Sequence, residues 1–423
     1  MRTRAIAMAL SLVVGLMGLG FAQTEVVWWD FLSGGDGVRM KALIDEFNQA
    51  HPDIQIKATT LEWGVPFYSK VQTAAAVGEH PDVMTYHLSR FPLGIEQGVL
   101  RPISDQELAA AGLSKDDYQP GLIDAATFDG KLYGIPFDVH SIILYYNRDI
   151  LEQAGLIGED GKPTGLDGLE NFNAALQAIA DNGQLPLSLA NSADPGTIWR
   201  VFYTLLNQQA GASDLLEGDE VVVGEEAQTA LDTMRGWIES GFARANVDYP
   251  SSIALFTSGD AAFMINGVWE VPTMKDLAAN GELGFEWGAI AIPTLFDQTA
   301  TWADSHMFAI PAASRNAVSD EKVAAVLEVV AWMNKNSLAW ASAGHIPAYK
   351  AVTESPEYQE LEPNATYSVL AETAVRDPRS PLAGVASPVY DAVSNYLEPA
   401  VNGQLPTDQA LEMLRQDLES QIR

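Results

Sequence analysis

One stretch of the chain, residues 129–151 (DGKLYGIPFDVHSIILYYNRDIL), has the pattern of a strand that crosses between two lobes rather than a strand inside one. Gly130 and Gly134 bracket a short turn, and Pro136 interrupts the strand pattern. A continuous apolar run, IILYY, follows and is typical of a strand buried on both faces. Asp138 and His140 lie between the proline and this run, where a two-lobed binding protein would contact its ligand. The segment therefore predicts two bodies joined by strands, with a site between them.

The first 22 residues have the pattern of a cleaved secretory signal peptide. Two arginines within the first four residues precede an uncharged apolar run over 5–19. Gly20 and Ala22 place small residues at the minus-three and minus-one positions of a cleavage site before Gln23. The alternative is an uncleaved membrane anchor, because the apolar run is almost long enough to span a bilayer. The small residues at its end favour cleavage.

The chain contains no cysteine, which excludes disulfides, thiolate metal sites and cysteine nucleophiles. It also excludes the lipid-modified cysteine that tethers many exported proteins to a membrane. Removing 22 of 423 residues leaves 401, which is enough for two or more domains. We therefore expect a periplasmic protein without a lipid anchor, stabilised by a large core.

The charge of the chain excludes some classes of partner. The net charge is -32, and loss of the two leader arginines makes the mature chain more negative still, so we expect no nucleic-acid partner. Acidity of this kind usually serves solubility, but a cationic ligand such as a polyamine is an alternative. The six histidines show no H-x-x-x-H pair, so we expect no metal site and no cofactor.

The first part of the mature chain alternates strand and helix patterns. Residues 25–30 (EVVWWD) are typical of a buried strand, and a glycine-rich loop follows. Four apolar residues then recur at helical spacing on one face: Met40, Leu43, Ile44 and Phe47. His51 and Pro52 end this helix, and alternation of Ile54 and Ile56 with polar residues predicts the next strand. This β-loop-α-β order predicts an open α/β sheet.

Later segments predict the rest of the two-lobed fold. Residues 81–86 (PDVMTY) predict a strand that ends in the polar loop HLSR, and ligands gather at such strand ends. Helical stretches and short strands over 151–301 predict a second lobe with its own core. Residues 305–311 (SHMFAIP) and 344–347 predict a second and a third passage between the lobes.

Five segments are similar, in this order and spacing, to one family of proteins: PDVMTYHLSRF, EQGVL, GKLYGIPFDVHSIILYYNRDIL, FTSGDAAFMINGVW and AGHIPAY. The chain resembles the family 1 extracellular solute-binding proteins of bacterial ABC importers, which include maltose-binding proteins. The resemblance implies an α/β, two-lobed periplasmic binding protein fold of class II-like type, with three interlobe crossings. It implies a signal peptide over 1–22, lobe I from 23–136 and 307–345, and lobe II from 137–306 and 346–423.

The resemblance also implies ligand contacts at matching positions. In the family, the loop after the first strand contacts sugar hydroxyls, which implicates Phe31 and Asp36 here. The aromatic residue and the arginine that follow the PD strand in maltose binders are matched by Tyr86 and Arg90. Ser89 stands where those relatives have an acid, which argues against a maltose-type ligand.

Three further positions carry over from the family. His140 replaces a family glutamate just past the first crossing, which also argues against maltose. The N-G-x-W motif is kept as Asn266, Gly267 and Trp269, and this tryptophan stacks on sugar in maltose-binding relatives. Tyr390 stands in for a C-terminal stacking aromatic residue.

The chemistry of a sugar gives a separate reason to select residues. A pyranose has apolar C–H faces and a rim of hydroxyls, so it needs flat aromatic rings and hydrogen-bonding side chains. Candidates for stacking are Trp63, Trp199, Trp269 and Tyr86. Candidates for hydrogen bonding are Asp36, Arg90, Asp138, His140 and Asp304, together with the strand-end histidines His87, His306 and His345. The alternatives are core packing for the tryptophans and hinge-stabilising hydrogen bonds for Asp138 and His140.

These patterns favour a transport receptor that binds a sugar or oligosaccharide, closes by hinge motion and delivers it to ABC permease subunits. We expect a monomer without enzymatic activity. A polyamine or other small-solute receptor is an alternative within this class. An exported glycoside hydrolase is an alternative from another class, and it needs two carboxylates across the scissile bond. The two-lobed pattern, rather than eight similar βα units, argues against a barrel-type hydrolase.

Overall fold

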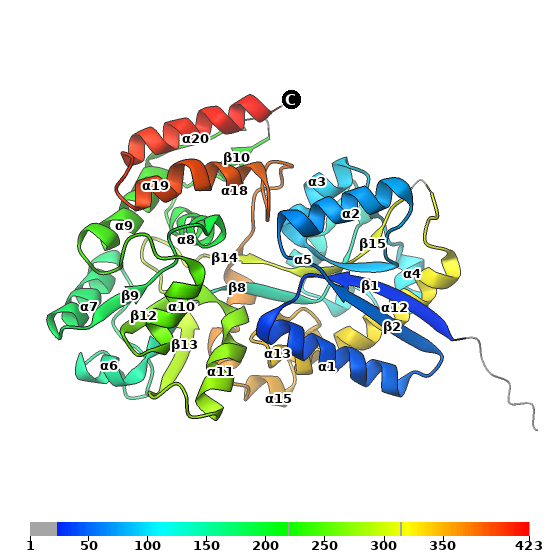
Figure 1. Ribbon diagram of the computed structural model, residues 1–423, viewed down its shortest axis with the longest axis horizontal. Helices are drawn as coiled ribbons and strands as arrows, with labels where there is room; N and C mark the ends of the chain where they lie inside the picture. Colours follow the sequence, from blue (N-terminus) through cyan, green and yellow to red (C-terminus); the bar gives the residue numbers. More distant parts are fainter. Residues whose placement is uncertain (1–22, 219, 314, 423) are drawn as a thin grey trace, which may run out of the picture.

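The computed structural model describes residues 23–218, 220–313 and 315–422, and the predicted signal peptide lies outside them. Two bodies lie side by side, each built on one mixed sheet with helices packed around it (Figure 1). Lobe I is built on a sheet of order β2-β1-β3-β15-β4, with β7 paired to β15. Lobe II is built on a sheet of order β17-β14-β8-β12-β9, with β13 and β16 paired to β8. The predicted α/β two-lobed fold is confirmed.

The elements of each lobe follow the chain in three blocks. The first block belongs to lobe I: β1 Thr24–Asp30, α1 Gly34–Ala50, β2 Ile54–Thr60, α2 Val65–Val77, β3 Val83–His87, α3 Phe91–Glu96, β4 Leu100–Arg101, α4 Asp105–Ala110, α5 Pro120–Ala125, β5 Thr127–Phe128, β6 Lys131–Leu132 and β7 Ile135–Pro136.

The second block builds lobe II and then returns to lobe I: β8 Asp138–Asn147, α6 Arg148–Gln153, α7 Leu169–Asp181, β9 Leu185–Ser188, α8 Pro195–Asn207, β10 Leu216–Glu217, β11 Glu220–Val221, α9 Glu225–Glu239, α10 Tyr249–Thr257, β12 Ala261–Gly267, α11 Val271–Ala279, β13 Trp287–Ala291, β14 Thr301–Asp304, β15 His306–Pro311, α12 Asp320–Lys335 and α13 Leu338–Ala341.

The third block completes the molecule: β16 Ile346–Pro347, α14 Lys350–Thr353, α15 Pro356–Gln359, α16 Asn364–Tyr367, α17 Leu370–Thr373, β17 Ala374–Val375, α18 Pro388–Ala392, α19 Glu398–Val401 and α20 Thr407–Gln421. Its last helices cover lobe II, where α20 packs on α9 (Figure 1).

The apolar patterns of the sequence explain where each core lies. The four-residue stripe of α1 is buried, with Met40 and Phe47 packed into lobe I. Strand β8 is buried along its whole length because it pairs successively with β16, β14, β12 and β13. A strand paired on both edges and covered on both faces needs a continuous apolar run, which is the run that the sequence showed.

The chain passes between the two sheets three times. It leaves lobe I between β7 and β8, returns at Ser305 between β14 and β15, and leaves again between α13 and β16. Three short segments therefore come together where the two sheets meet, and their polar side chains are brought close to one another.

No helix in the part of the chain that the structure describes combines the length and the apolar character needed to cross a membrane.

Candidate functional site

A cavity of about 400 Å³ lies between the two lobes. Its lining comes from both lobes and from the crossing segments: Phe31, Leu32, Ser33, Gly34, Gly35, Asp36, Trp63, His87, His140, Ala193, Asp194, Arg200, Tyr249, Trp269, Glu270, Thr273, His306 and His345. Helices α1 and α11 meet beside it, where Arg39 pairs with Asp276 at 2.8 Å. A Cβ added to Gly35 would lie 2.5 Å from Pro272, so glycine allows the lobes to approach this closely.

The wall from lobe I is formed by the loop after β1 and the end of β3. The Asp30 carboxylate accepts a hydrogen bond from the Leu32 amide at 3.0 Å and fixes this loop. Phe31 then stacks on His87 with ring centroids 4.4 Å apart and an interplanar angle of 6°. Tyr68 bonds to Nδ1 of His87 at 2.5 Å, so the other ring nitrogen is left for the cavity.

The wall from lobe II presents Trp269 just after β12. A Cβ at Gly267 would lie 2.1 Å from the indole, so the glycine of the N-G-x-W motif lets the ring lie flat against the backbone. The indole N–H donates to the Tyr249 hydroxyl at 2.8 Å, and that hydroxyl donates to Glu270 at 2.6 Å. The guanidinium of Arg200 lies 4.8 Å from the ring centroid of Trp269, within cation–π distance. The ring orientation is therefore fixed before a ligand binds.

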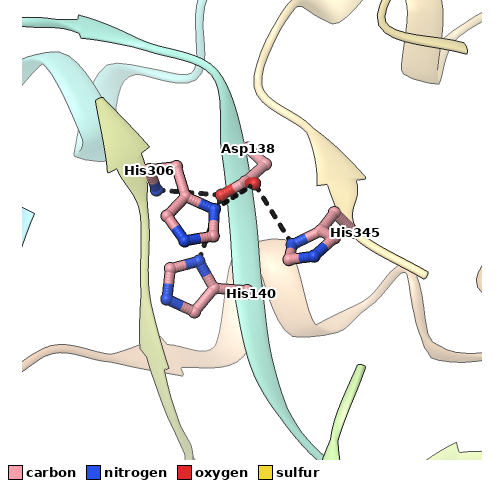
Figure 2. Close-up of side chains that lie close together, drawn as sticks. All are labelled: Asp138, His140, His306 and His345. Atoms are coloured by element: carbon pink, nitrogen blue, oxygen red, sulfur yellow. Dashed lines mark hydrogen bonds and ion pairs between the residues drawn. The ribbon is translucent and has the colours of Figure 1, made fainter. Parts of the chain in front are cut away.

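The cavity floor consists of histidines gathered around Asp138. Asp138 is fully buried and accepts hydrogen bonds from the His306 amide (2.9 Å), the His306 ring (2.8 Å), the His140 ring (3.1 Å) and the Trp340 indole (2.8 Å). His345 Nδ1 lies 3.1 Å from the same carboxylate, and its Nε2 bonds to Asp36 at 3.0 Å. Figure 2 shows the three rings converging on Asp138 from different segments.

Charges on this floor are set by burial and by the neighbouring groups. Burial opposes a charge on His345, but Asp36 and Asp138 outweigh it and raise the pKa of His345 to about 10. Burial, together with the charge on His306, lowers the pKa of His140 to about 3. Burial also opposes ionisation of Asp138, yet His306 and His345 hold the pKa of Asp138 well below its usual value. The floor thus combines a carboxylate, a charged imidazole and a neutral imidazole.

Comparison with known proteins identifies the family. The model of the bacterial extracellular solute-binding proteins matches residues 42–366, more than half of the chain. The chain belongs to the bacterial extracellular solute-binding proteins. The mannitol-binding protein of Pseudomonas aeruginosa is 26% identical over 93% of this chain and 92% of its own length. A maltooligosaccharide ABC transporter solute-binding lipoprotein of Streptococcus pneumoniae is 24% identical over 86% of this chain and 82% of its own length.

Solved structures confirm the fold of this solute-binding protein. The GacH receptor of Streptomyces glaucescens superposes with a TM-score of 0.78 and 20% identity, covering 95% of this chain and 98% of that chain. The maltose-bound MalE3 protein of T. maritima gives a TM-score of 0.78 at 21% identity, covering 94% of this chain and 100% of that chain.

Eight of the fifteen predicted site residues line the cavity of the solute-binding protein. They come from both lobes and from all three crossings: Phe31, Asp36, Trp63, His87, His140, Trp269, His306 and His345. Their contact with a ligand stays a prediction, because the structure holds none.

The other seven do not line this cavity, and their contact with a ligand also stays a prediction. Two of them contact lining residues from behind: Asp138 holds the histidines, and Asn266 Oδ1 lies 3.2 Å from the Tyr249 hydroxyl. Asp304 accepts a hydrogen bond at 2.6 Å from Ser89, which lies outside the lining. Tyr86 and Arg90 pack around Tyr68, and Arg90 donates to the Ala386 carbonyl at 3.0 Å.

Trp199 and Tyr390 are the remaining two. Trp199 is buried, stacks on Tyr203 and donates its indole N–H to Asp377 at 2.6 Å. Tyr390 is buried in the same region of lobe II, where burial raises the pKa of its hydroxyl above the usual range. Both aromatic residues belong to the core of lobe II rather than to the cavity.

Sequence reasoning missed six polar lining residues: Ser33, Asp194, Arg200, Tyr249, Glu270 and Thr273. Asp194 is the N-cap of α8 and accepts from the Thr197 amide at 3.2 Å, and Arg200 lies on the same helix. The D-P-G-T pattern at the start of α8 signals a helix N-terminus. That signal predicts a helix start but not its direction toward the site.

A buried carboxyl of this solute-binding protein makes its stability depend on pH. Asp377 accepts hydrogen bonds from Trp199 and Trp302, and burial together with nearby Asp304 raises the pKa of Asp377 to about 7. The folded state therefore keeps a proton that the unfolded state loses near its usual pKa of about 4, and stability falls as the pH rises from about 4 to about 7.

We expect Asp377→Asn to remove the loss of stability at rising pH. Asparagine keeps an acceptor for the two indoles but cannot ionise. Its melting temperature should exceed that of the wild type at pH 8, and the difference should shrink toward pH 4. Calorimetry of both proteins across this range measures the effect. A constant difference at every pH would contradict the argument.

Proposed function

We propose that this protein is the sugar or sugar-alcohol receptor of an ABC importer. The observation that carries the proposal is the cavity itself, which has an indole on each lobe and hydrogen-bonding side chains between them. Trp63 comes from lobe I and Trp269 from lobe II. Trp63 is 43% exposed at the rim, so a ligand can reach its face. Flat rings suit the C–H faces of a sugar, and the carboxylates, histidines and Arg200 suit its hydroxyls.

The size of the cavity supports a small ligand. A volume of about 400 Å³ is near the lower end of the range for ligand sites. Two indoles line the cavity rather than the three that the sequence suggested, because Trp199 is in the core. We therefore favour a monosaccharide, disaccharide or hexitol over a longer oligosaccharide. The name of the mannitol-binding relative agrees with such a small ligand, whereas the name of the maltooligosaccharide relative indicates a longer one.

The location of the protein and its role in transport are proposed from its family and its leader pattern. The extracellular location of the family and the leader pattern support a cleaved signal peptide and a periplasmic location. The lack of cysteine supports a receptor without a lipid anchor, and we propose that it acts as a monomer. Its relatives bind solutes for transport, which supports a receptor that closes on its ligand, releases it unaltered to permease subunits and has no enzymatic activity.

A thermal-shift screen with hexoses, disaccharides, hexitols and polyamines tests the proposal. A sugar or hexitol at a hundredfold excess over its dissociation constant should add about 2.7 kcal/mol to the stability. Chromatography of the released ligand should recover it chemically unchanged. Stabilisation by a polyamine alone would favour the cationic-ligand alternative, which the acidic residues Asp36, Asp194 and Glu270 would serve. Conversion of the sugar would indicate a hydrolase.

A further inference from the structure

The three interlobe crossings place metal-ligating side chains at one point. Asp138 and His140 lie on β8 at the first crossing, His306 begins β15 at the second, and His345 precedes β16 at the third. One ligand atom from each of these four residues lies within 4.8 Å of the others, and all four residues are buried. We propose that Asp138, His140, His306 and His345 bind one divalent transition-metal ion of the zinc type (Figure 2).

Two of the three histidines meet Asp138 at one carboxylate oxygen, Oδ2, and the third meets Oδ1. The Nδ1 atoms of His140, His306 and His345 lie 3.1, 2.8 and 3.1 Å from its carboxylate oxygens. Zinc binds nitrogen and oxygen at about 2.0–2.1 Å, so neighbouring ligand atoms of a tetrahedral site are about 3.3 Å apart. Because the four ligand atoms lie within 4.8 Å of one another, the side chains would close around an ion that takes the place of the shared protons.

His345 gives an independent reason to expect a ligand. Its Nδ1 is buried and 3.1 Å from Asp138, yet it has no hydrogen-bond partner among the described residues, because its alignment with the carboxylate is poor. A metal ion at this point would give this buried nitrogen a well-aligned partner in place of its poorly aligned contact with Asp138. Its Nε2 meanwhile bonds to Asp36 at 3.0 Å. A carboxylate on the far nitrogen is the arrangement that orients metal-bound histidines.

The surrounding groups define the kind of ion and its path. Three imidazoles and one carboxylate favour zinc or another first-row transition ion over calcium and magnesium, which prefer oxygen ligands. His140, His306 and His345 line the cavity, so an ion can reach them from the cleft. The bound ion would tie together the three segments about which the lobes move. The sequence pattern predicted no metal site because His306 and His345 lie far along the chain from Asp138 and His140.

The test uses the tag-free mature protein, stripped with a chelator and then given ZnCl2, MgCl2 or CoCl2. Wild type should retain one zinc per chain after gel filtration, by elemental analysis, and should melt at a higher temperature with zinc but not with magnesium. Cobalt should give the intense visible absorption of a tetrahedral site. His140→Gln and His345→Gln should each weaken zinc binding at least tenfold. The control is His80→Gln, since within the described ranges His80 bonds only to the carbonyls of Pro81 and Asn316.

The proposal fails if wild type retains no zinc or if both cluster variants bind zinc as tightly as His80→Gln does. The first result would mean that the cluster is a hydrogen-bond network alone, and the second would place the ion elsewhere. If the variants do not fold, the cobalt spectrum of the wild type decides. None of these measurements involves a sugar, so their outcome is independent of the proposed receptor function.

Discussion

Replacing Asp138 by alanine is expected to lower the free energy of unfolding by about 3–5 kcal/mol. The side chain is fully buried, accepts four hydrogen bonds and lies 3.1 Å from His345. Alanine would leave these donors without an acceptor and would remove one of the two carboxylates that stabilise the buried charge on His345. Urea denaturation of the metal-free protein, with chelator present, measures the loss.

The matched control for this change is Asp276→Ala. Asp276 also pairs with a cation, Arg39, but its side chain is 60% exposed and should contribute less than about 1 kcal/mol. A loss at Asp138 as small as that at Asp276 would mean that the buried network contributes little to stability. It would also contradict the structural role given to Asp138, which is to hold the histidines of the cavity floor.

Trp269→Ala is expected to weaken binding of the cognate sugar by about 1–3 kcal/mol while the fold is kept. The ring is already oriented by Gly267, Tyr249 and Arg200, so its loss removes a stacking surface that needs no rearrangement on binding. Titration calorimetry with the sugar found in the screen gives the affinity, and circular dichroism checks the fold.

Trp332→Ala serves as the control for this second change. Trp332 is a partly buried tryptophan on α12 of lobe I, far from the cavity lining, so its removal should lower stability without changing affinity. Equal affinity of wild type and Trp269→Ala would show that the ligand does not stack on this ring. The sugar would then have to bind against Trp63 alone.

Local sequence patterns were enough to predict the two-lobed fold and the site residues that lie at the ends of strands. Periodicity predicted α1 and β8, and the N-G-x-W motif predicted Trp269, because these signals reflect contacts within a few residues. Trp199 and Arg200 show where this reasoning stops. They are neighbours on α8, but one faces the core and the other the cavity. Which face of α8 meets the cleft depends on how the helix packs on lobe II, which no local pattern records.

The histidines show the same limit at longer range. His87, His140, His306 and His345 were selected singly, as polar residues at strand ends or crossings. Their gathering around Asp138 depends on three crossings converging at one point, and the separations along the chain between them reach 258 residues from His87 to His345. Sequence reasoning could name these residues but could not show that one carboxylate holds three of them.

The convergence of the crossings on Asp138 also determines which parts of the site travel when the lobes rotate. Points near a pivot move little and points far from it move far, so the imidazoles keep almost the same positions in the open and the closed receptor. The indoles of Trp63 and Trp269 lie on separate lobes, so rotation of the lobes changes the distance between them. An arriving solute would first contact the polar side chains of the cavity floor. The two indoles would enclose it only when the lobes close. Selectivity among hydroxyl patterns would then be decided before closure, and closure itself would mainly set how long the solute stays.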